Sequence, residues 1–448
     1  MKKILMVCNY FAPDNVIAAV RITKIAKYLN QRGYEVSVIA EQRQNIEDEI
    51  LGRDAEGIKV IRVNNSAGVL KFIAFYQKII APIKSKKYDN LDNRVKINPG
   101  TGKNEFYPFQ TAYPFIGSLD YLMETIRQYD LFWSSKKYLS EYLNVDYVFT
   151  SYGSFLGLFA GAHMHKKHIP WIFDIRDSIC QYKFTPRYVR WIALLFERYI
   201  WKRADCITAV SKGICRRVPR KYWNKVHCVT NGYDKKDREG ISIDDKARNK
   251  LRFSYTGAMY GGLRNLSPLF KNIRELIDKN EIDEDRIEFC FAGSESAFQI
   301  FNSQAQNYRL DKNVVYYGKV TRTESLRLQM ESDILLVSSF DYQEETGGII
   351  TGKVLEYMSA DKPILAIING DIENSELKGI IYKAKLGFAY EESHEKEDEE
   401  ELSIRLLMWY KEFMENGRIS HNPDRQELKR FDYRYLGNKM RKIIENTH

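Results

Sequence analysis

KKILMVCNYFAPDNVIAAVRITKIAKYLNQRGYEVSVIAE, residues 2–41, contains the pattern that decides the fold. Its two apolar runs, 3–8 and 35–40, predict buried strands. Between them apolar residues recur at helical spacing: Val16, Val20, Ile25 and Leu29. Gly33 then supplies the stop signal of that helix. A strand, a helix and a second strand in this order predict one β-α-β unit with parallel strands.

The same alternation of apolar runs and helical spacing continues along most of the chain. In the front half it predicts further strands at 58–63, 146–150, 170–175, 205–210 and 226–230. After a polar stretch it restarts, with strands predicted at 251–257, 286–292, 313–317, 333–338 and 362–368. Because 448 residues exceed what one hydrophobic core usually organises, the two series predict two α/β domains, each with a doubly wound parallel sheet.

The domain boundaries are predicted from the composition between these series. An acidic segment at 391–401 is expected to form a solvated loop. The predicted parts are a front domain at 1–232 with an aromatic-rich insertion at 64–145, a polar linker at 233–250, a rear domain at 251–428, and a basic amphipathic helix at 429–448 that returns to the front domain.

Positive charge is concentrated in the front half. Residues 1–230 carry about +16 and residues 231–448 about −6, which together give the net charge of +10. Such a surface attracts nucleic acid, anionic lipid headgroups or phosphorylated substrates. Nucleic acid is the least favoured of these partners, because no nucleic-acid-binding motif is present. The run at 70–80 fits either an interfacial helix or an ordinary helix packed on the core.

Several classes of protein are not favoured. The six cysteines form no C-x-x-C pair, which predicts free thiols. The apolar run at 3–8 is too short for a signal peptide, and no stretch of 18 uncharged apolar residues predicts a membrane span. Asp283 and Asp285 precede a predicted strand and are interpreted as a solvated turn. We therefore expect a cytoplasmic protein with no metal site.

Two segments that follow predicted strands are candidate phosphate sites. Ligands bind there in doubly wound sheets, because backbone N–H groups converge where strands end and helices begin. The first segment, YTGAMYGGLRN at 255–265, has a glycine-rich turn followed by Arg264. Glycines allow close backbone approach to a diphosphate, and a guanidinium binds its oxygens bidentately. The alternative is an ordinary turn with a surface arginine.

The second segment is ETGGIITGKVLEYM at 345–358. Thr351, Gly352 and Lys353 at a helix start could hold phosphate, and Glu356, one turn later, could accept hydrogen bonds from ribose hydroxyls. The alternative is an exposed helix with a Lys–Glu pair. Neighbouring apolar residues favour a buried helix instead, where unpaired charge would be costly.

TGKVLEYMSADKPI at 351–364 resembles the donor-site helix of GT-B glycosyltransferases, in the family 4 group that includes capsule and O-antigen enzymes. Further resemblances follow in the family's order and extend over nearly the whole chain: NYFAP at 9–13, FDIRD at 173–177, RADCITAVS at 203–211 and VTNGYD at 229–234. The resemblance implies the GT-B fold, in which two Rossmann-like domains face a central cleft.

The resemblance also implies an activity and a set of site residues. It implies retaining transfer of a sugar from a nucleoside-diphosphate sugar, most commonly of uridine, to a hydroxyl of a glycan or lipid-linked acceptor in surface polysaccharide biosynthesis. No further cofactor is expected. The implied donor residues are Arg264 and Lys353 for the diphosphate, Glu356 for the ribose, Gly293 and the turn from Gly318 to Val320 for the base, and Gly257, Thr351 and Gly352 beside them.

On the acceptor side, the resemblance implies Asp14, Tyr152 and Asp177. Asp177 could orient or deprotonate the acceptor hydroxyl, and its alternative role is a structural carboxylate paired with Arg176. The expected partners are a nucleotide sugar and a saccharide or lipid-linked acceptor. The basic front half adds the hypothesis of a third partner, the anionic surface at the inner face of a membrane.

One position departs from the family. A second glutamate usually lies eight positions before Glu356, and here that position is Gly348. Glu344 or Glu345 could reach the donor sugar instead. Two alternatives therefore stay open: a sugar-nucleotide epimerase on the same fold, which would need no acceptor, and a noncatalytic scaffold subunit.

Overall fold

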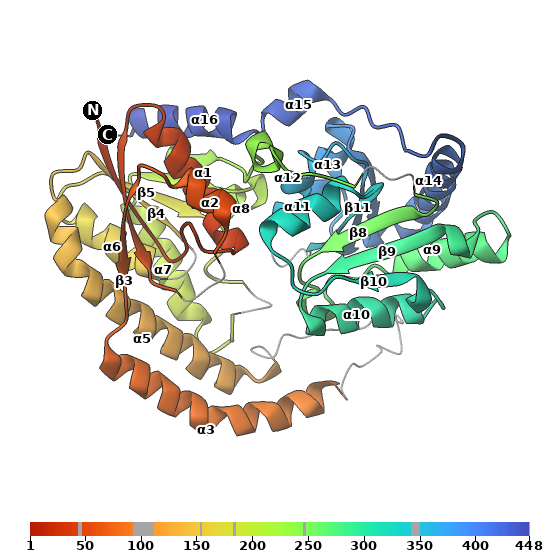
Figure 1. Ribbon diagram of the computed structural model, residues 1–448. Helices are drawn as coiled ribbons and strands as arrows, with labels where there is room; N and C mark the ends of the chain where they lie inside the picture. The colour runs from red at the N-terminus through yellow and green to blue at the C-terminus, as the bar shows by residue number, and fades with distance from the viewer. Residues whose placement is uncertain are drawn as a thin grey trace. The chain divides into compact units, whose positions relative to one another are not determined.

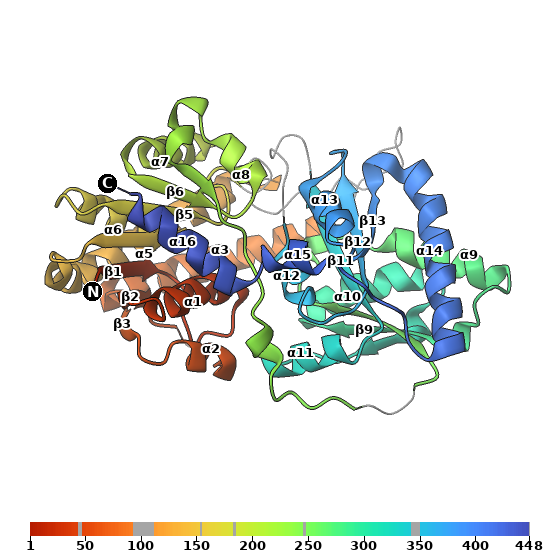
Figure 2. The same ribbon diagram turned by 90° about the horizontal axis from the view of Figure 1, so that it is seen from above.

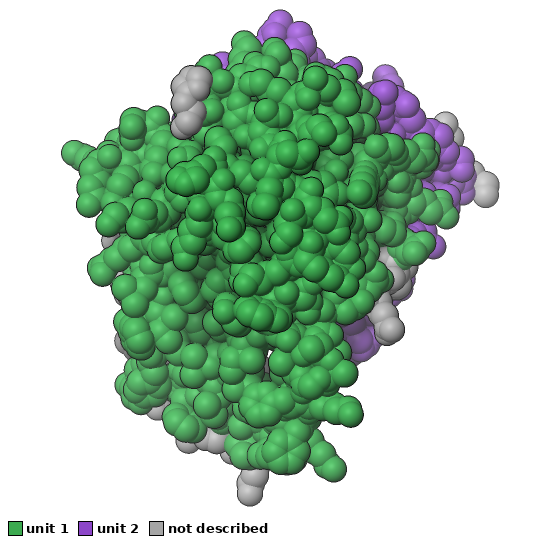
Figure 3. All heavy atoms as spheres, turned by 90° about the vertical axis from the view of Figure 1, so that its left-hand side faces the viewer, with its two compact units in different colours: residues 1–210, 214–229, 437–448 green, residues 211–213, 230–436 purple. Residues whose placement is uncertain are grey.

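The protein folds as two compact units, each with its own sheet and core. Figure 3 colours unit 1, residues 1–210, 214–229 and 437–448, and unit 2, residues 211–213 and 230–436. The units are described one at a time. The computed structural model describes residues 1–43, 47–92, 112–152, 155–181, 185–244, 248–341 and 350–447.

Unit 1 is built on a parallel sheet with the strand order β3-β2-β1-β4-β5-β6-β7. Its seven strands coincide with the predicted ones to within two residues. They are β1 (Lys3–Cys8), β2 (Glu35–Glu41), β3 (Lys59–Val63), β4 (Tyr147–Ser151), β5 (Trp171–Ile175), β6 (Cys206–Ala209) and β7 (Val226–Cys228). The central strands are buried on both faces, as helices on the two sides of a parallel sheet require.

Helices cover both faces of this sheet (Figures 1 and 2). The chain moves from β1 to β2 and β3 in one direction and from β3 to β4, β5 and β6 in the other. Because parallel crossovers are right-handed, α1 and α2 cover one face and α5, α6 and α7 the opposite face. The bounds are α1 (Ile17–Asn30), α2 (Glu49–Asp54), α3 (Ala67–Asp92), α5 (Pro114–Leu139), α6 (Leu156–His165), α7 (Arg190–Arg203) and α8 (Lys212–Arg217), the last at the boundary with unit 2.

The aromatic-rich insertion forms the two long helices α3 and α5. They pack on each other through Ile80 and Ile116, with Tyr76 alongside. The Tyr76 hydroxyl donates to Asp120 at 2.9 Å, and the Lys84 ammonium donates to the same carboxylate at 2.8 Å. The missing strand signal in this part of the sequence therefore reflects helices that pack outside the sheet.

Unit 2 has a second parallel sheet, with the order β10-β9-β8-β11-β12-β13. Five of its strands were predicted. Its strands are β8 (Leu251–Thr256), β9 (Ile287–Ala292), β10 (Val314–Tyr316), β11 (Ile334–Asp341), β12 (Ile364–Gly370) and β13 (Gly387–Glu391). Its helices are α9 (Ser267–Asp278), α10 (Glu295–Gln306), α11 (Arg322–Met330), α12 (Gly352–Tyr357), α13 (Glu376–Lys383), α14 (Glu395–Asn416) and α15 (Arg425–Lys429). Figure 2 shows α9 and α14 along the same side of this sheet.

The prediction of a solvated acidic loop at 391–401 is wrong. Glu391 ends β13 as a buried residue, and its carboxylate accepts the backbone N–H groups of Asn374 at 3.0 Å and Ser375 at 2.8 Å. From Glu395 onward the acidic residues begin α14, where negative charge is favourable near a helix N-terminus. Within that helix, Asp398 is buried and accepts from Lys378 at 2.8 Å.

The last helix, α16 (Tyr433–Glu445), begins in unit 2 and ends in unit 1. At its start, the Tyr433 N–H donates to the carbonyl of Tyr233 at 3.0 Å. In unit 1, Gly437 packs against Tyr28, and the hydroxyl of Tyr34 donates to Glu445 at 3.2 Å. None of the described helices is both long and apolar enough to cross a bilayer.

Candidate active site

Three turns at the carboxyl edge of the unit 2 sheet, at Gly257, Gly293 and 318–320, are joined by backbone hydrogen bonds. We call this surface the shelf. The Gly257 N–H after β8 donates to the carbonyl of Ala292 at 2.7 Å, and the Gly293 N–H after β9 donates to the carbonyl of Gly318 at 2.9 Å. A Cβ on Gly293 would lie 2.7 Å from the Gly257 carbonyl oxygen, so a larger residue would separate the turns. The shelf brings together the predicted residues Gly257, Gly293 and the turn at 318–320, whose Val320 packs against the end of β9.

Lys353 lies directly on this shelf. A Cβ on Gly257 would lie only 2.1 Å from the Lys353 Nζ, so the glycine leaves the space that the ammonium occupies. The helix that carries Lys353 is fixed by buried Val354 and Leu355 and by Tyr357, whose hydroxyl lies 3.1 Å from the Thr256 hydroxyl. Within the described ranges, no carboxylate forms an ion pair with Lys353.

The pKa of Lys353 is lowered to about 8. Burial is the largest cause, and the nearby Arg264 guanidinium acts in the same direction, whereas Glu356 opposes both. A buried cation with a second cation beside it is unfavourable unless an anion joins them. The arrangement therefore favours an anionic ligand.

Arg264 reaches the same region from the glycine-rich turn after β8. Its Nη1 donates to the carbonyl of Ala258 at 2.9 Å and to the hydroxyl of Tyr255 at 3.3 Å, and its guanidinium lies 4.4 Å from the centre of the Tyr260 ring. The side chain is 9% exposed, and its Nε has no hydrogen-bond partner in the described part of the chain. Arg264 is thus held in place with donor capacity left for a ligand.

Glu356 is held by three residues that the sequence did not single out. Its carboxylate accepts from the Gln329 amide at 2.7 Å and pairs with Arg322 at 3.2 Å. Arg238 donates to the Glu356 carbonyl at 3.2 Å and to the Gln329 side chain at 2.5 Å. Burial by itself would raise the pKa of Glu356, but Arg322 and Arg238 outweigh burial and lower it. Glu356 is therefore ionised and fixed beside the shelf.

These three residues differ in how far the sequence could have revealed them. Arg322 follows Thr321, which forms a capping box with Glu324, so the T-x-x-E spacing marks a helix start after β10. Arg238 lies in the segment predicted as a linker, where no pattern distinguishes it. Arg322 also pairs with Asp237 at 2.9 Å, which ties this segment to the site.

Thr351 and Gly352 precede Lys353 at the start of α12. The Thr351 hydroxyl is buried and has no hydrogen-bond partner among the residues that the structure describes. Gly348, Glu344 and Glu345, on which donor-sugar recognition was expected to depend, lie outside the described residues. Their predicted roles stay predictions.

The three predicted acceptor residues lie in unit 1, each after the carboxyl end of one of the adjacent strands β1, β4 and β5. Asp14 is buried, accepts the Phe11 N–H at 3.3 Å and pairs with Arg62 at 3.4 Å, so it braces its own loop. Tyr152 packs against Phe155 with ring centres 6.2 Å apart, and burial raises its pKa well above the usual range.

Asp177 is exposed, unlike the other two acceptor residues. The ion pair with Arg176 that the sequence left open is not formed, and Arg176 donates to the carbonyl of Ala18 at 2.8 Å. The surrounding protein desolvates the Asp177 carboxyl and raises its pKa, which the charge of Arg176 opposes. Asp177 has no hydrogen bond or ion pair within the described ranges. Its carboxylate is therefore available to an acceptor.

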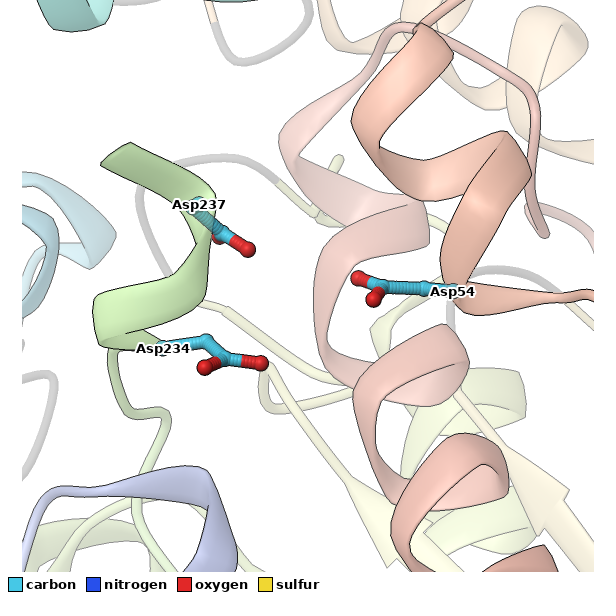
Figure 4. A group of neighbouring side chains, drawn as sticks. All are labelled: Asp54, Asp234 and Asp237. Atoms are coloured by element: carbon cyan, nitrogen blue, oxygen red, sulfur yellow. The ribbon is translucent and has the colours of Figure 1, made fainter. Parts of the chain in front are cut away.

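Figure 4 shows Asp234 just before and Asp237 within the short 3-10 helix Lys235–Arg238 of unit 2, and Asp54 at the end of α2 in unit 1. Each carboxylate has partners within its own unit. Asp54 pairs with Lys24 and Lys27, both at 2.5 Å. Asp234 accepts the Lys236 N–H at 3.1 Å, and Asp237 pairs with Arg322. These contacts account for the three residues structurally, and we assign no metal to them.

Two family models match the sequence and together span more than half of the chain. One, described as a glycosyl transferase 4-like domain, matches residues 125–232, and the other, described as glycosyl transferases group 1, matches residues 247–396. The second match contains every predicted donor residue. The chain is a family 4-like GT-B glycosyltransferase. Comparison with curated proteins gives no match.

Solved structures confirm the GT-B fold of this glycosyltransferase. Sucrose-phosphate synthase from Thermosynechococcus elongatus aligns with a TM-score of 0.57 at 11% identity, covering 99% of this chain and 98% of that one. The lipopolysaccharide outer core galactosyltransferase WaaB aligns with a TM-score of 0.55 at 11% identity, covering 100% of both chains.

An epimerase shares the fold as well. UDP-GlcNAc 2-epimerase from Neisseria meningitidis, bound to UDP-GlcNAc, aligns with a TM-score of 0.53 at 12% identity over 99% of both chains. The fold alone thus does not separate transferase from epimerase. The family models, which both describe glycosyl transferases, favour the transferase.

Proposed function

We propose that this glycosyltransferase moves a sugar, with retention of anomeric configuration, from a nucleoside-diphosphate sugar to a hydroxyl of a glycan or lipid-linked saccharide in surface polysaccharide biosynthesis. One observation carries the donor part of the proposal: the Lys353 ammonium lies on the Gly257 turn beside Arg264, and no described carboxylate pairs with it. A diphosphate would supply the missing negative charge at the place where backbone and cations converge.

The reaction breaks the bond between the anomeric carbon and the diphosphate oxygen and forms a bond to the acceptor oxygen. Negative charge grows on the departing diphosphate, so the fixed cations Lys353 and Arg264 stabilise the transition state more than the ground state. Glu356, ionised and held by Arg322 and Gln329, would accept hydrogen bonds from the ribose and orient the nucleotide. The acceptor hydroxyl loses its proton as its oxygen bonds to the sugar.

Asp177 is the proposed acceptor-side residue. Its exposed carboxylate, without a described partner, could orient the acceptor hydroxyl or take its proton. Asp14 is a weaker candidate for this task, because its carboxylate already accepts from Phe11 and pairs with Arg62.

We propose uridine diphosphate as the carrier. The family resemblance favours uridine, and the N. meningitidis epimerase of the same fold was solved with UDP-GlcNAc bound. The base would lie against the turns at Gly293 and 318–320. Backbone hydrogen bonds join these turns to the Gly257 turn, where the diphosphate is proposed to bind.

A panel of nucleoside diphosphates and sugar nucleotides tests the donor proposal by thermal shift. We expect one diphosphate series to raise the melting temperature of the wild type and to lose this effect in Lys353→Ala, whereas Lys279→Ala, at an exposed lysine of unit 2, keeps it. No shift with any nucleotide would favour the noncatalytic scaffold.

Incubating the protein with the preferred sugar nucleotide, but without an acceptor, distinguishes a transferase from an epimerase. A transferase leaves the sugar nucleotide unchanged apart from slow hydrolysis, whereas an epimerase converts it to a second sugar nucleotide with the same mass. Nuclear magnetic resonance of the anomeric proton distinguishes the two outcomes, and formation of the epimer would overturn the proposal.

A further inference from the structure

The outward stripe of α5 is apolar over most of its length. From Pro114 to Trp133, five positions are exposed, and each holds a large apolar side chain with an exposed fraction of 38% to 68%: Phe115, Leu122, Ile126, Tyr129 and Trp133. Spacings of seven, four, three and four residues place them on one side of the helix. The next exposed position is Lys137, and Lys136 lies 4.1 Å from the centre of the Trp133 ring.

The outward stripe of α7 also has apolar residues first and basic residues after them. Its exposed positions begin with Trp191 at 62% and Leu195 at 49% and continue with Arg198 and Lys202. Both helices cover the same face of the unit 1 sheet. Ring contacts connect them through α6, since Phe159 lies 5.3 Å from Tyr129 of α5 and 6.1 Å from Phe196 of α7.

The helix α3 adds a third apolar stripe next to α5 (Figure 1). Its inner side packs on α5 through Tyr76 and Ile80. Beside that side run four exposed apolar residues at spacings of three, four and four: Phe72, Phe75, Ile79 and Ile83. Lys71 and Lys78 are exposed on the adjoining side. We call the outward stripes of α3, α5 and α7 the helix face.

Charge on the helix face has one sign. The outward stripes of α3 up to residue 85, of α5 and of α7 contain no acidic residue. Glu124, whose side chain is 44% exposed, lies on another side of α5. The acidic side chains of these segments pair with their neighbours: Asp120 with Lys84, Glu124 with Arg127, Asp130 with Ser66 and Glu197 with Arg217. The exposed cations, by contrast, stand at the ends and edges of the apolar stripes.

We propose that the helix face docks on an anionic lipid bilayer. Monomeric proteins rarely expose contiguous apolar surface of this kind without a partner. Aromatic and aliphatic side chains that enter the headgroup region, with lysine and arginine beside them, match the chemistry of an anionic membrane interface. An apolar protein partner or a second copy of this chain would account for the apolar stripes, but not for the lysines and arginines beside them on stripes that contain no acidic residue.

The inference deepens the proposed function, on which it rests for its purpose: docking would hold the enzyme where a lipid-linked acceptor lies. Its test, however, needs no substrate. The full-length protein is sedimented with vesicles of phosphatidylcholine alone or mixed with phosphatidylglycerol, at low and high salt. We expect binding to the anionic vesicles at low salt, weaker binding to the neutral ones, and a loss of affinity at high salt.

Two variants and a matched control identify the surface. Trp133→Ser with Trp191→Ser should lower partitioning into anionic vesicles by at least about tenfold. Lys137→Glu with Arg198→Glu should lower it by about tenfold for anionic vesicles and little for neutral ones. Ile404→Ser with Met408→Ser, at comparably exposed positions of α14 in unit 2, should leave partitioning unchanged. All positions are exposed, and circular dichroism verifies folding.

Three results would overturn the docking proposal: no binding of the wild type to anionic vesicles, equal binding of the wild type and both helix-face variants, or a dimer that the tryptophan variant dissociates while vesicles bind nothing. Nucleotide thermal shift on the same variants separates this proposal from the proposed function. Vesicle binding without any nucleotide shift would remove the donor assignment and leave the membrane surface in place.

Discussion

Two groups of buried charges, one in each unit, differ in whether an opposite charge lies beside them in the protein. In unit 1, the Asp174 carboxylate accepts two bonds from Arg21, at 2.7 and 2.9 Å, and one from the Thr208 hydroxyl at 2.6 Å. In unit 2, Lys353 and Arg264 lie close together without a described carboxylate between them. The comparison teaches that the Arg21–Asp174 pair is neutralised within the protein, whereas two adjacent buried cations without a described carboxylate between them indicate a place for an anionic ligand.

The largest expected effect is on the stability of the complete pair. Asp174→Ala would leave Arg21 buried without its anion, and the free energy of unfolding should fall by about 3–5 kcal/mol. Urea denaturation of the full-length protein measures this. Arg425→Ala, which breaks the exposed pair with Asp361, is the control and should cost no more than about 1 kcal/mol. Equal losses would show that burial does not distinguish the two pairs.

Substitution of the cations Lys353 and Arg264, which have no described counterion, should lower activity more than stability. Arg264→Ala or Lys353→Ala should lower kcat by roughly 10² to 10³, because each removes a fixed cation from the departing diphosphate. Steady-state kinetics with the preferred donor measures the loss, and the melting temperature should stay near that of the wild type. A full-activity Lys353→Ala enzyme would contradict the assignment of the leaving-group site.

A smaller effect is expected where a partner of Glu356 is removed. Arg322→Ala takes away the main cation that lowers the pKa of Glu356, so that pKa should rise. Donor affinity should fall by about tenfold, roughly the contribution of one charge-assisted hydrogen bond. Calorimetric titration measures it. Arg327→Ala, at an exposed arginine of the same helix that makes none of the Glu356 contacts described above, should bind like the wild type.

The pH dependence gives the mildest test. Because the pKa of Lys353 is lowered to about 8 in the free protein, the ammonium is present below that pH and is lost above it. Donor affinity should therefore be constant below about pH 7 and decline above pH 8, by up to tenfold per pH unit. Lys353→Arg keeps its charge throughout this range and should show a flat profile, even where its absolute affinity is lower.

Much of the fold could be predicted from the sequence, because parallel strands buried on both faces leave continuous apolar runs such as 3–8 and 251–257. The strand at Gly387–Glu391 was not predicted, because it is short and is followed directly by an acidic segment. The charge of that segment predicts a loop, but in the structure its acidic residues begin α14, and Asp398 contacts Lys378. No local pattern in the sequence reveals that contact.

The candidate site was predictable where its residues follow strands and carry a local motif, as Gly257, Arg264 and Lys353 do. The sequence did not predict the contacts that hold Glu356, because they form between segments far apart in the sequence. These contacts come from Arg238, Arg322 and Gln329. The structure also separates residues that the sequence treated alike: Asp14 is engaged by its own loop, whereas Asp177 is exposed.

Proton uptake on nucleotide binding tests the central claim most directly. At pH 8 about half of the Lys353 side chains are neutral before binding, and a diphosphate would draw the missing protons onto them. Calorimetric titration with uridine diphosphate in buffers of different ionisation enthalpy should show uptake of about half a proton in the wild type and none in Lys353→Ala. Binding with the same proton uptake in both proteins, or no binding at all, would contradict the account.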